Sequence, residues 1–442
     1  MTTSIGFIGA GNMGRPFIVA LRQRGFQVTV HDIDTQCRPW VLAQGAQWAD
    51  SPAQAARDCQ VLVTCLPLPC HVWLMMTGDQ GALAGLSPGA VWVDTSTTDY
   101  HNTLAVAALA ERLGVMSLEA PVSNLSHMGV DFNNVCFYAA GAAQAYARAE
   151  PALRAMGQHA LHVGAIGQGQ SVKLLTNLLF YSATLVWGEL LLAAQTHGLN
   201  LHWLWQVAKS SRGNCFVVDQ VTPLLLDGSY DYSCSLQITV KDTALTVALA
   251  DELKVALPLG RTVEQRYRQA GACYPTHANH LRVVHMIERE HGRSLQIPGF
   301  TAPSPYGANR DYRHPLERDV DTCGRVKPAL PSRYDYALSH PAGLDIAYSL
   351  LEVMALGNHL ILHEALTLGR AMGLDHALLD QVVSRSCGPS WVSDHPDEYT
   401  PQPSVLGDIP ALLAGLQLPM VEAVLKQNAS PTLPCAVDGR SL

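Results

Sequence analysis

The apolar residues of the first 160 positions form short runs separated by longer stretches with helical spacing. The first run covers 5–8, residues 14–24 repeat apolar positions with the period of a helix, and a second run covers 26–32. Further runs lie at 61–67, 90–97, 115–123 and 135–141. Short apolar runs are typical of buried strands, and the stretches between them of helices. The alternation predicts an α/β domain with a doubly wound, mostly parallel sheet.

The pattern changes after residue 163. Apolar positions at helical spacing fill 164–297 and 341–442, whereas 298–340 is rich in proline and lacks that period. We therefore predict a dinucleotide-binding domain at 1–163, an all-α domain at 164–297, a connector at 298–340 and a second helical region at 341–442. The apolar run 174–194 is long enough to suggest a membrane span, but its polar residues argue against one.

A glycine-rich turn connects the first apolar run to the first helical stretch. It consists of Gly9, Ala10, Gly11, Asn12, Met13 and Gly14, which is a GxGxxG pattern. Such glycines permit a tight turn and close approach of a pyrophosphate, and the helix N-terminus favours anions. Asp32 ends the next run, where a ribose hydroxyl would bind, and it would repel a 2′-phosphate. The pattern predicts a Rossmann-type domain that prefers NAD over NADP, although His31 and Arg38 keep NADP open.

The ends of the later runs carry further candidate residues. Ligands of doubly wound sheets bind beyond the carboxyl ends of the strands. Leu66 and Pro67, Ser96 and Ser123 occupy such ends. We expect them to border the cofactor and the substrate, although the hydroxyl of Ser96 would also fit a plain turn.

Lys173 is the only charged residue between Arg154 and Glu189, and leucines surround it. An ammonium group is costly to bury without a partner or a task. Burial among apolar side chains disfavours the charged form of a lysine, which brings its pKa nearer the range useful for acid–base catalysis. Asn177, one helical turn later, projects from the same face. The alternative is a side chain that extends from the helix into water.

Composition narrows the classes of function. With 442 residues, of which 48% are hydrophobic and 15% charged, the chain is expected to form two or three globular domains. The net charge of −8 and the lack of a basic tract argue against nucleic-acid binding. Eleven cysteines without a CxxC, and no leader-like start, predict a reduced cytoplasmic protein.

Several motifs in order resemble the β-hydroxyacid dehydrogenase family, that of 3-hydroxyisobutyrate dehydrogenase. They are "GFIGAGNMG", "CLP", "DTST", "EAPVS", "GAIGQGQSVKLLTN" and "VKDTALTVA". The resemblance implies that Lys173 is the catalytic acid/base, that Asn177 orients the substrate, and that Lys241 supports the cofactor and substrate. It further implies that Ser123 grips a substrate carboxylate together with the next two backbone amides, here of Asn124 and Leu125.

This chain departs from the family pattern directly after Ser123, where two glycines are replaced by Asn124 and Leu125. The departure leaves the substrate open beyond a small anionic or polar molecule. Two other readings stay open. One is an imine reductase of the same fold, although those enzymes generally replace the lysine. The other is a catalytically idle NAD-binding sensor or scaffold.

The second half repeats part of the first. Residues 185–213 and 360–388 align without a gap at an offset of 175, with ten identities in 29 positions. The copy has Tyr348 at the position of Lys173 and Glu352 at that of Asn177, so it cannot repeat the chemistry. 6-Phosphogluconate dehydrogenases resemble this plan of a duplicated helical domain. We expect a homodimer, or a monomer in which the repeat imitates a dimer contact.

The sequence also contains a candidate metal site. His359 and His363 lie four residues apart beside Glu364 and could in principle ligate a metal. Such pairs arise by chance among 18 histidines, and hydride transfer with a lysine acid/base needs no metal. We therefore predict no metal and no membrane or nucleic-acid partner.

Overall fold

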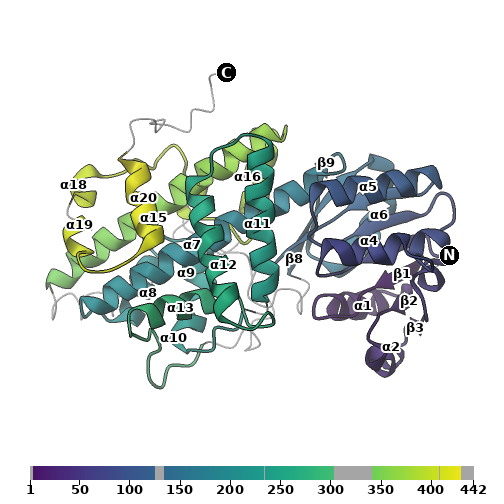
Figure 1. The fold of residues 1–442 in the computed structure, drawn as a ribbon, viewed down its shortest axis with the longest axis horizontal. Coiled ribbons are helices and arrows are strands. Elements are labelled where there is room, and N and C mark those ends of the chain that lie inside the picture. The colour runs from purple at the N-terminus through teal and green to yellow at the C-terminus, as the bar shows by residue number, and fades with distance from the viewer. Residues whose placement is uncertain (1–2, 125–133, 233, 303–340, 408, 430–442) are drawn as a thin grey trace. The chain divides into compact units, whose positions relative to one another are not determined.

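The computed structural model forms two compact units, Met1–Lys173 and Leu174–Leu442. In the described part of the chain, the first unit contains a sheet with helices and the second is built of helices (Figure 1). The described residues are 3–124, 134–232, 234–302, 341–407 and 409–429. The Rossmann-type domain and the helical domain after it are thus confirmed. The predicted site residue Leu125 and connector residues 303–340 lie outside the described residues.

The sheet of the first unit has the order β3-β2-β1-β4-β5-β6-β8-β7, with β9 also paired to β8. Its strands are β1 (Ser4–Ile8), β2 (Gln27–His31), β3 (Gln47–Trp48), β4 (Val61–Thr64), β5 (Val91–Asp94), β6 (Met116–Glu119), β7 (Val122–Asn124), β8 (Val135–Gly141) and β9 (His159–Gly164). Strands β1 to β6 pair in parallel, which places their carboxyl ends at one edge.

One predicted strand, 115–123, is wrong because the structure divides it into β6 and β7. Pro121 lies between the two strands and has no N–H for the sheet. After it the chain changes partner: β6 pairs in parallel with β5 and antiparallel with β8, whereas β7, among the described strands, pairs with β8 alone. Ser123 therefore lies in a separate short strand, opposite Cys136.

Both faces of the sheet are covered, as a doubly wound fold requires. Phe7 packs into a core with Phe17 and Phe137, whereas its neighbour Ile8 packs into another core with Trp92. Successive side chains of a strand point to opposite faces, so the two cores lie on the two sides of β1. The helices of this unit are α1 (Gly14–Gln23), α2 (Arg38–Ala43), α3 (Pro52–Ala56), α4 (Pro69–Thr77), α5 (Tyr100–Arg112) and α6 (Ala143–Met156).

The second unit is organised around two long helices, α7 (Gln168–Thr196), which begins in the first unit, and α15 (Pro341–Ala371). By length and composition both could cross a membrane, but 100% and 78% of their most apolar windows are buried within the fold, as in core helices. The other helices are α8 (Leu201–Ala208), α9 (Phe216–Gln220), α10 (Thr222–Leu226), α11 (Leu236–Glu252), α12 (Pro258–Cys273), α13 (Arg282–Glu290), α16 (His376–Ser384), α17 (Trp391–Asp394), α18 (Pro403–Leu406), α19 (Ile409–Leu412) and α20 (Pro419–Asn428).

Candidate active site

The glycine-rich turn lies between β1 and α1, as predicted. A side chain on Gly9 would place its Cβ 2.3 Å from the carbonyl oxygen of Cys65, and one on Gly14 would place it 1.9 Å from the carbonyl oxygen of Gly9. Both positions therefore exclude side chains. Gly11, in contrast, has no atom within 4 Å of such a Cβ. The turn leaves open space before the N-terminus of α1, where a pyrophosphate would fit.

Asp32 follows β2 and lies against this turn. Its Oδ2 accepts a hydrogen bond of 2.6 Å from the backbone N–H of Ala10, and its Oδ1 accepts one of 2.8 Å from Asp34. The carboxylate is partly exposed, so it can also accept from a bound group. Asp32 therefore braces the turn and places a negative charge beside it.

His31 and Arg38, the basic residues that leave NADP open, each have a contact within the first unit. His31 is 7% exposed, and its Nδ1 lies 3.0 Å from the carbonyl oxygen of Ala49. Arg38 is exposed, and its guanidinium lies 3.9 Å from the carboxylate of Asp50.

The structure connects the ends of β4 and β5 through Ser96. Its hydroxyl accepts a hydrogen bond of 2.9 Å from the backbone N–H of Leu66, directly before the exposed Pro67. The side chain of Gln170, in α7, donates to the carbonyl oxygen of Ser96 and accepts from the backbone N–H of Thr98, both at 2.9 Å. Gln170 was missed from the sequence, although it lies in the motif around Lys173.

Ser123 is fully buried in β7. The neighbouring Asn124 is half-buried, and its Oδ1 has no hydrogen-bond partner within the described part of the protein. A buried acceptor of this kind suits a polar ligand that the structure does not contain. The segment expected to hold the substrate therefore carries a polar side chain at the position of the first lost glycine.

Lys173 is 8% exposed, and the following residues Leu174 and Leu178 are 3% and 2% exposed. The side chain of Lys173 is therefore buried and does not extend into water. The helix that carries it is anchored at its first turn, because the backbone N–H of Gly169 donates a 2.7 Å hydrogen bond to Glu119 of β6. Burial raises the pKa of Glu119 to about 8, and hydrogen bonds from the helix start partly oppose that rise.

Asn177 lies one turn after Lys173 on α7 and is 4% exposed. Its Nδ2 donates a 2.8 Å hydrogen bond to Oδ2 of Asp242, which is 1% exposed. The hydroxyl of Tyr181, another turn along α7, is 3.5 Å from the same oxygen. The carboxylate fixes the amide of Asn177, so its Oδ1 and second N–H group can face a substrate.

Lys241 and Asp242 form an ion pair, with Nζ 3.0 Å from Oδ1. The apolar pattern that follows Lys241 predicts that this lysine opens its helix, which is wrong. Helix α11 begins at Leu236, and Ser235 caps it by accepting from Ile238. The lysine therefore lies in the second turn, and Asp242 is a partner of Asn177 and Lys241 instead of a cap.

Comparisons with known proteins agree with this geometry. Residues 4–164 match the family described as the NAD binding domain of 6-phosphogluconate dehydrogenase. Residues 167–287 match the NAD-binding domain of NADP-dependent 3-hydroxyisobutyrate dehydrogenase. The 3-hydroxyisobutyrate dehydrogenase of Pseudomonas aeruginosa is 32% identical over 265 residues, which cover 58% of this chain and 89% of that protein. The chain belongs to the β-hydroxyacid dehydrogenase family.

Other members of the β-hydroxyacid dehydrogenase family give the same extent of similarity. Glyoxylate/succinic semialdehyde reductase 2 of Arabidopsis thaliana is 29% identical, over 61% of this chain and 75% of its own. The solved structure of Mycobacterium tuberculosis 3-hydroxyisobutyrate dehydrogenase with L-serine covers 65% of this chain and 99% of its own, with a TM-score of 0.60 and 27% identity. The resemblance drawn from the motifs is confirmed over the two matched ranges, 4–164 and 167–287. The family consists of NAD(P)-dependent dehydrogenases that act on CH–OH groups.

Proposed function

We propose that this family member transfers a hydride between a nicotinamide and a small 3-hydroxy acid, or its carbonyl or semialdehyde partner. The observation that carries the proposal is the arrangement on α7: a buried Lys173 one turn before Asn177, whose amide is held by Asp242. Buried amines and fixed amides serve proton transfer and substrate orientation.

The residues at the sheet edge fit a dinucleotide. The open space at Gly11 would receive the pyrophosphate, and Asp32 would accept from a ribose hydroxyl. The segment at Leu66, Pro67 and Ser96 would border the nicotinamide half. When bound, the cofactor supplies the hydride acceptor or donor. The side chains of the protein would supply proton transfer and substrate binding.

Those side chains divide the proton chemistry and the binding. During oxidation, the amine of Lys173 takes the proton of the substrate hydroxyl as hydride leaves the adjoining carbon. During reduction, its ammonium returns that proton to the carbonyl oxygen. Asn177 orients the same oxygen, and Ser123 with Asn124 holds the substrate's anionic or polar end. Lys241 supports this arrangement through its ion pair with Asp242.

The substitution Asp242→Asn tests the positioning of Asn177. The substitution replaces the carboxylate that accepts from Asn177 with a neutral amide. It also removes the ionic partner of Lys241. We expect kcat to fall by up to about 10²-fold, because a small misplacement of an orienting group is costly. The Kd for NADH should stay near the wild-type value, as measured by fluorescence titration. The exposed Asp251, on the same helix, gives the matched control Asp251→Asn, and equal losses of kcat in both variants would contradict the assignment.

We infer a preference for NAD, supported by the carboxylate of Asp32 beside the turn. The change Asp32→Ser should lower the ratio of kcat/KM for NAD to that for NADP by about 10²-fold, since like charges in contact cost several kcal/mol. Steady-state kinetics with both cofactors measure this ratio. Asp34→Ser, two residues later, is the control, and an unchanged ratio in Asp32→Ser would refute the role of the charge.

A catalytically idle dinucleotide-binding protein is the second candidate, because Asn124 and Leu125 replace the glycines of the family pattern. Lys173 counts against the third reading, an imine reductase. We further infer a cytoplasmic protein without membrane partners, supported by eleven cysteines without a CxxC, and without nucleic-acid partners, supported by the net charge of −8. A turnover panel of hydroxy acids, aldehyde acids and imines separates the three candidates.

We also propose that the helices after residue 341 are a duplicate of the family's helical domain. Local geometry at the offset of 175 supports the duplication. Gly198 and Gly373 have φ of 75° and 77°, and the next helix in each half is capped by an Asx side chain, Asn200 or Asp375. The second half has Tyr348, 42% exposed, at the position of Lys173. It is therefore a copy without the catalytic groups.

A further inference from the structure

The two halves of the second unit exchange equivalent hydrogen bonds. Glu189 of α7 accepts hydrogen bonds of 3.0 and 2.8 Å from two backbone N–H groups at the start of α20. Glu364 of α15 accepts hydrogen bonds of 2.9 and 3.0 Å from two backbone N–H groups at the start of α12. Glu189 and Glu364 occupy equivalent positions of the sequence repeat, and each carboxylate caps a helix of the other half.

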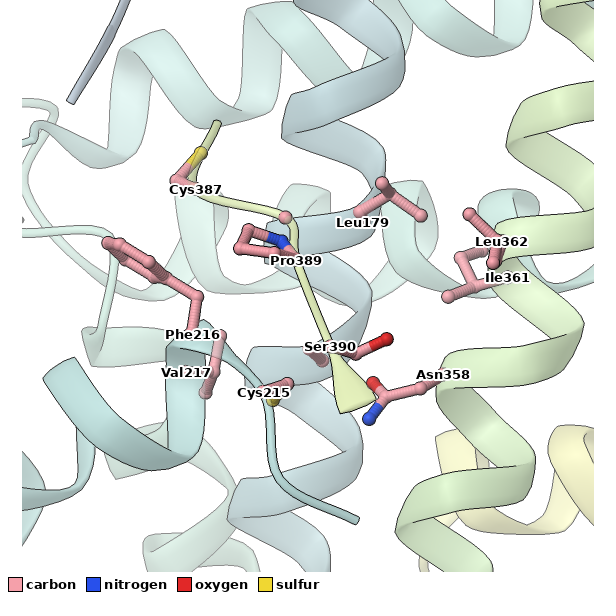
Figure 2. Close-up of a pocket in the computed structure, with 12 residues that line it drawn as sticks. Leu179, Cys215, Phe216, Val217, Asn358, Ile361, Leu362, Cys387, Pro389 and Ser390 are labelled. Carbon is pink, nitrogen blue, oxygen red and sulfur yellow. The ribbon is translucent and has the colours of Figure 1, made fainter. Parts of the chain in front are cut away.

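A second exchange occurs at Cys215 and Ser390, which are related by the same offset as the two glutamates and form an isolated antiparallel bridge. The N–H group after Cys215 donates to the carbonyl oxygen before Ser390 at 2.9 Å, and the N–H group after Ser390 donates to the carbonyl oxygen before Cys215 at 2.8 Å. Figure 2 shows this crossing, with Leu179 of α7 and Asn358 of α15 beside it. The cavity there measures about 10 Å³, roughly the space of one water, so the contact is closely packed.

A third exchange concerns two glycines. A Cβ on Gly388 would lie 2.8 Å from Cβ of Leu179 in the first half. A Cβ on Gly213 would lie 3.1 Å from Cβ of Met354 in the second half. Gly213 is equivalent to Gly388 in the repeat, and Leu179 is likewise equivalent to Met354. Each half therefore approaches the other through the same glycine and an apolar residue at the same position.

Contacts of this kind define an isologous interface, in which the same surface occurs on both sides and each contact appears twice. Two identical subunits form such an interface around a two-fold axis. Here the glutamate caps, the antiparallel bridge and the glycine contacts all join two segments of one chain. We name this surface the internal seam.

We propose that residues 341–428 occupy, within the same chain, the surface on which a second subunit would otherwise bind, so that the working protein is a single chain with one site. The internal seam covers the self-complementary face of the first helical half. Leu179, which supports the seam, lies on α7 two residues after Asn177, so the second half also packs against the helix of the candidate site. The non-catalytic copy thus serves as a built-in partner. This proposal does not depend on the dehydrogenase function.

The size of the full chain in solution gives the first test. Light scattering across a range of protein concentrations should return the mass of one chain, 47.7 kDa. A particle of twice that mass would overturn the proposal, because a second subunit would then be present.

The substitution Ser390→Cys gives the second test and reports whether the seam forms within one chain. Cys215 and Ser390 face each other as a non-hydrogen-bonded pair, because the two hydrogen bonds of the bridge are made by their neighbours. The Cα atoms of such a pair lie about 4.5 Å apart, a distance that suits a disulfide. After mild oxidation, non-reducing electrophoresis and peptide mapping should show a link between positions 215 and 390 in a particle of one-chain mass. A covalent dimer, or no link at these positions, would overturn the proposal. Ser384→Cys, in α16, is the control and should form no link to Cys215.

Discussion

Replacing Lys173 with methionine is expected to lower kcat of hydride transfer by about 10²–10⁴-fold, the usual contribution of a general acid or base. Methionine keeps the length and the buried, apolar stem of the side chain but removes the group that carries the proton. The glycine turn and Asp32 are untouched, so the Kd for NADH should remain nearly unchanged. Stopped-flow measurement of NADH formation separates the chemical step from cofactor release.

Two comparisons make this experiment decisive. Lys426→Met, at a lysine of α20 outside the candidate site, should leave kcat unchanged. If Lys173→Met kept the wild-type rate, Lys173 would not be the acid/base. If the wild-type protein bound NADH but turned over no hydroxy acid, aldehyde acid or imine, the idle candidate would be favoured.

The second large effect concerns stability and pH. Burial raises the pKa of Glu189 from 4.5 to about 8 and that of Glu364 to about 7, although backbone N–H groups oppose the rise in both cases. The folded state then binds these protons more tightly than the unfolded chain. Their contribution to stability is complete below about pH 4.5 and is lost as the pH rises towards 8. For Glu189 the change between pH 5 and 8 is on the order of 3–4 kcal/mol, at 1.36 kcal/mol per pH unit.

Another buried group titrates with the opposite effect on stability, so the contribution of Glu189 is measured as a difference between variants. Burial lowers the pKa of His280 to about 3, and a neutral buried histidine gains stability as the pH rises to about 6.5, which is the opposite direction. The stability of the wild type relative to Glu189→Gln should therefore fall between pH 5 and pH 8, because only the wild type has the Glu189 carboxyl group to ionise. Melting temperatures at constant ionic strength measure this difference. Glu398→Gln, at an exposed position, should show a constant difference, and a constant difference for Glu189→Gln would refute the assignment.

The parts of the fold that the sequence predicted well depend on neighbouring residues. The unit from β1 to β2 is set by apolar runs, a glycine turn and a helix stop that lie close together in the chain, so its pattern is local. The division between β6 and β7 depends instead on which strands they pair with. Pro121 is a local signal for this division. The antiparallel pairing of β7 with β8, in contrast, joins residues that are not neighbours in the sequence, so the local pattern does not predict it.

The candidate site shows the same limit. The placement of Lys173 and Asn177 one turn apart on a single helix could be predicted from their spacing. Asp242 is 65 residues from Asn177 in the chain, and no spacing rule predicts that its carboxylate turns towards α7. The role of Gln170, which joins Ser96 and Thr98, also depends on contacts between residues far apart in the sequence. Likewise, the alignment at an offset of 175 predicted a copy but not its reciprocal contacts.

The sequence contains a single GxGxxG, so each chain offers one glycine-rich turn of this kind to a nucleotide. In a symmetric oligomer, occupancy of one subunit can alter the affinity of the next. If the second half takes the place of a partner subunit, no second glycine-rich turn is present to which nucleotide binding could be coupled. Its saturation by NADH should therefore be hyperbolic, without cooperativity.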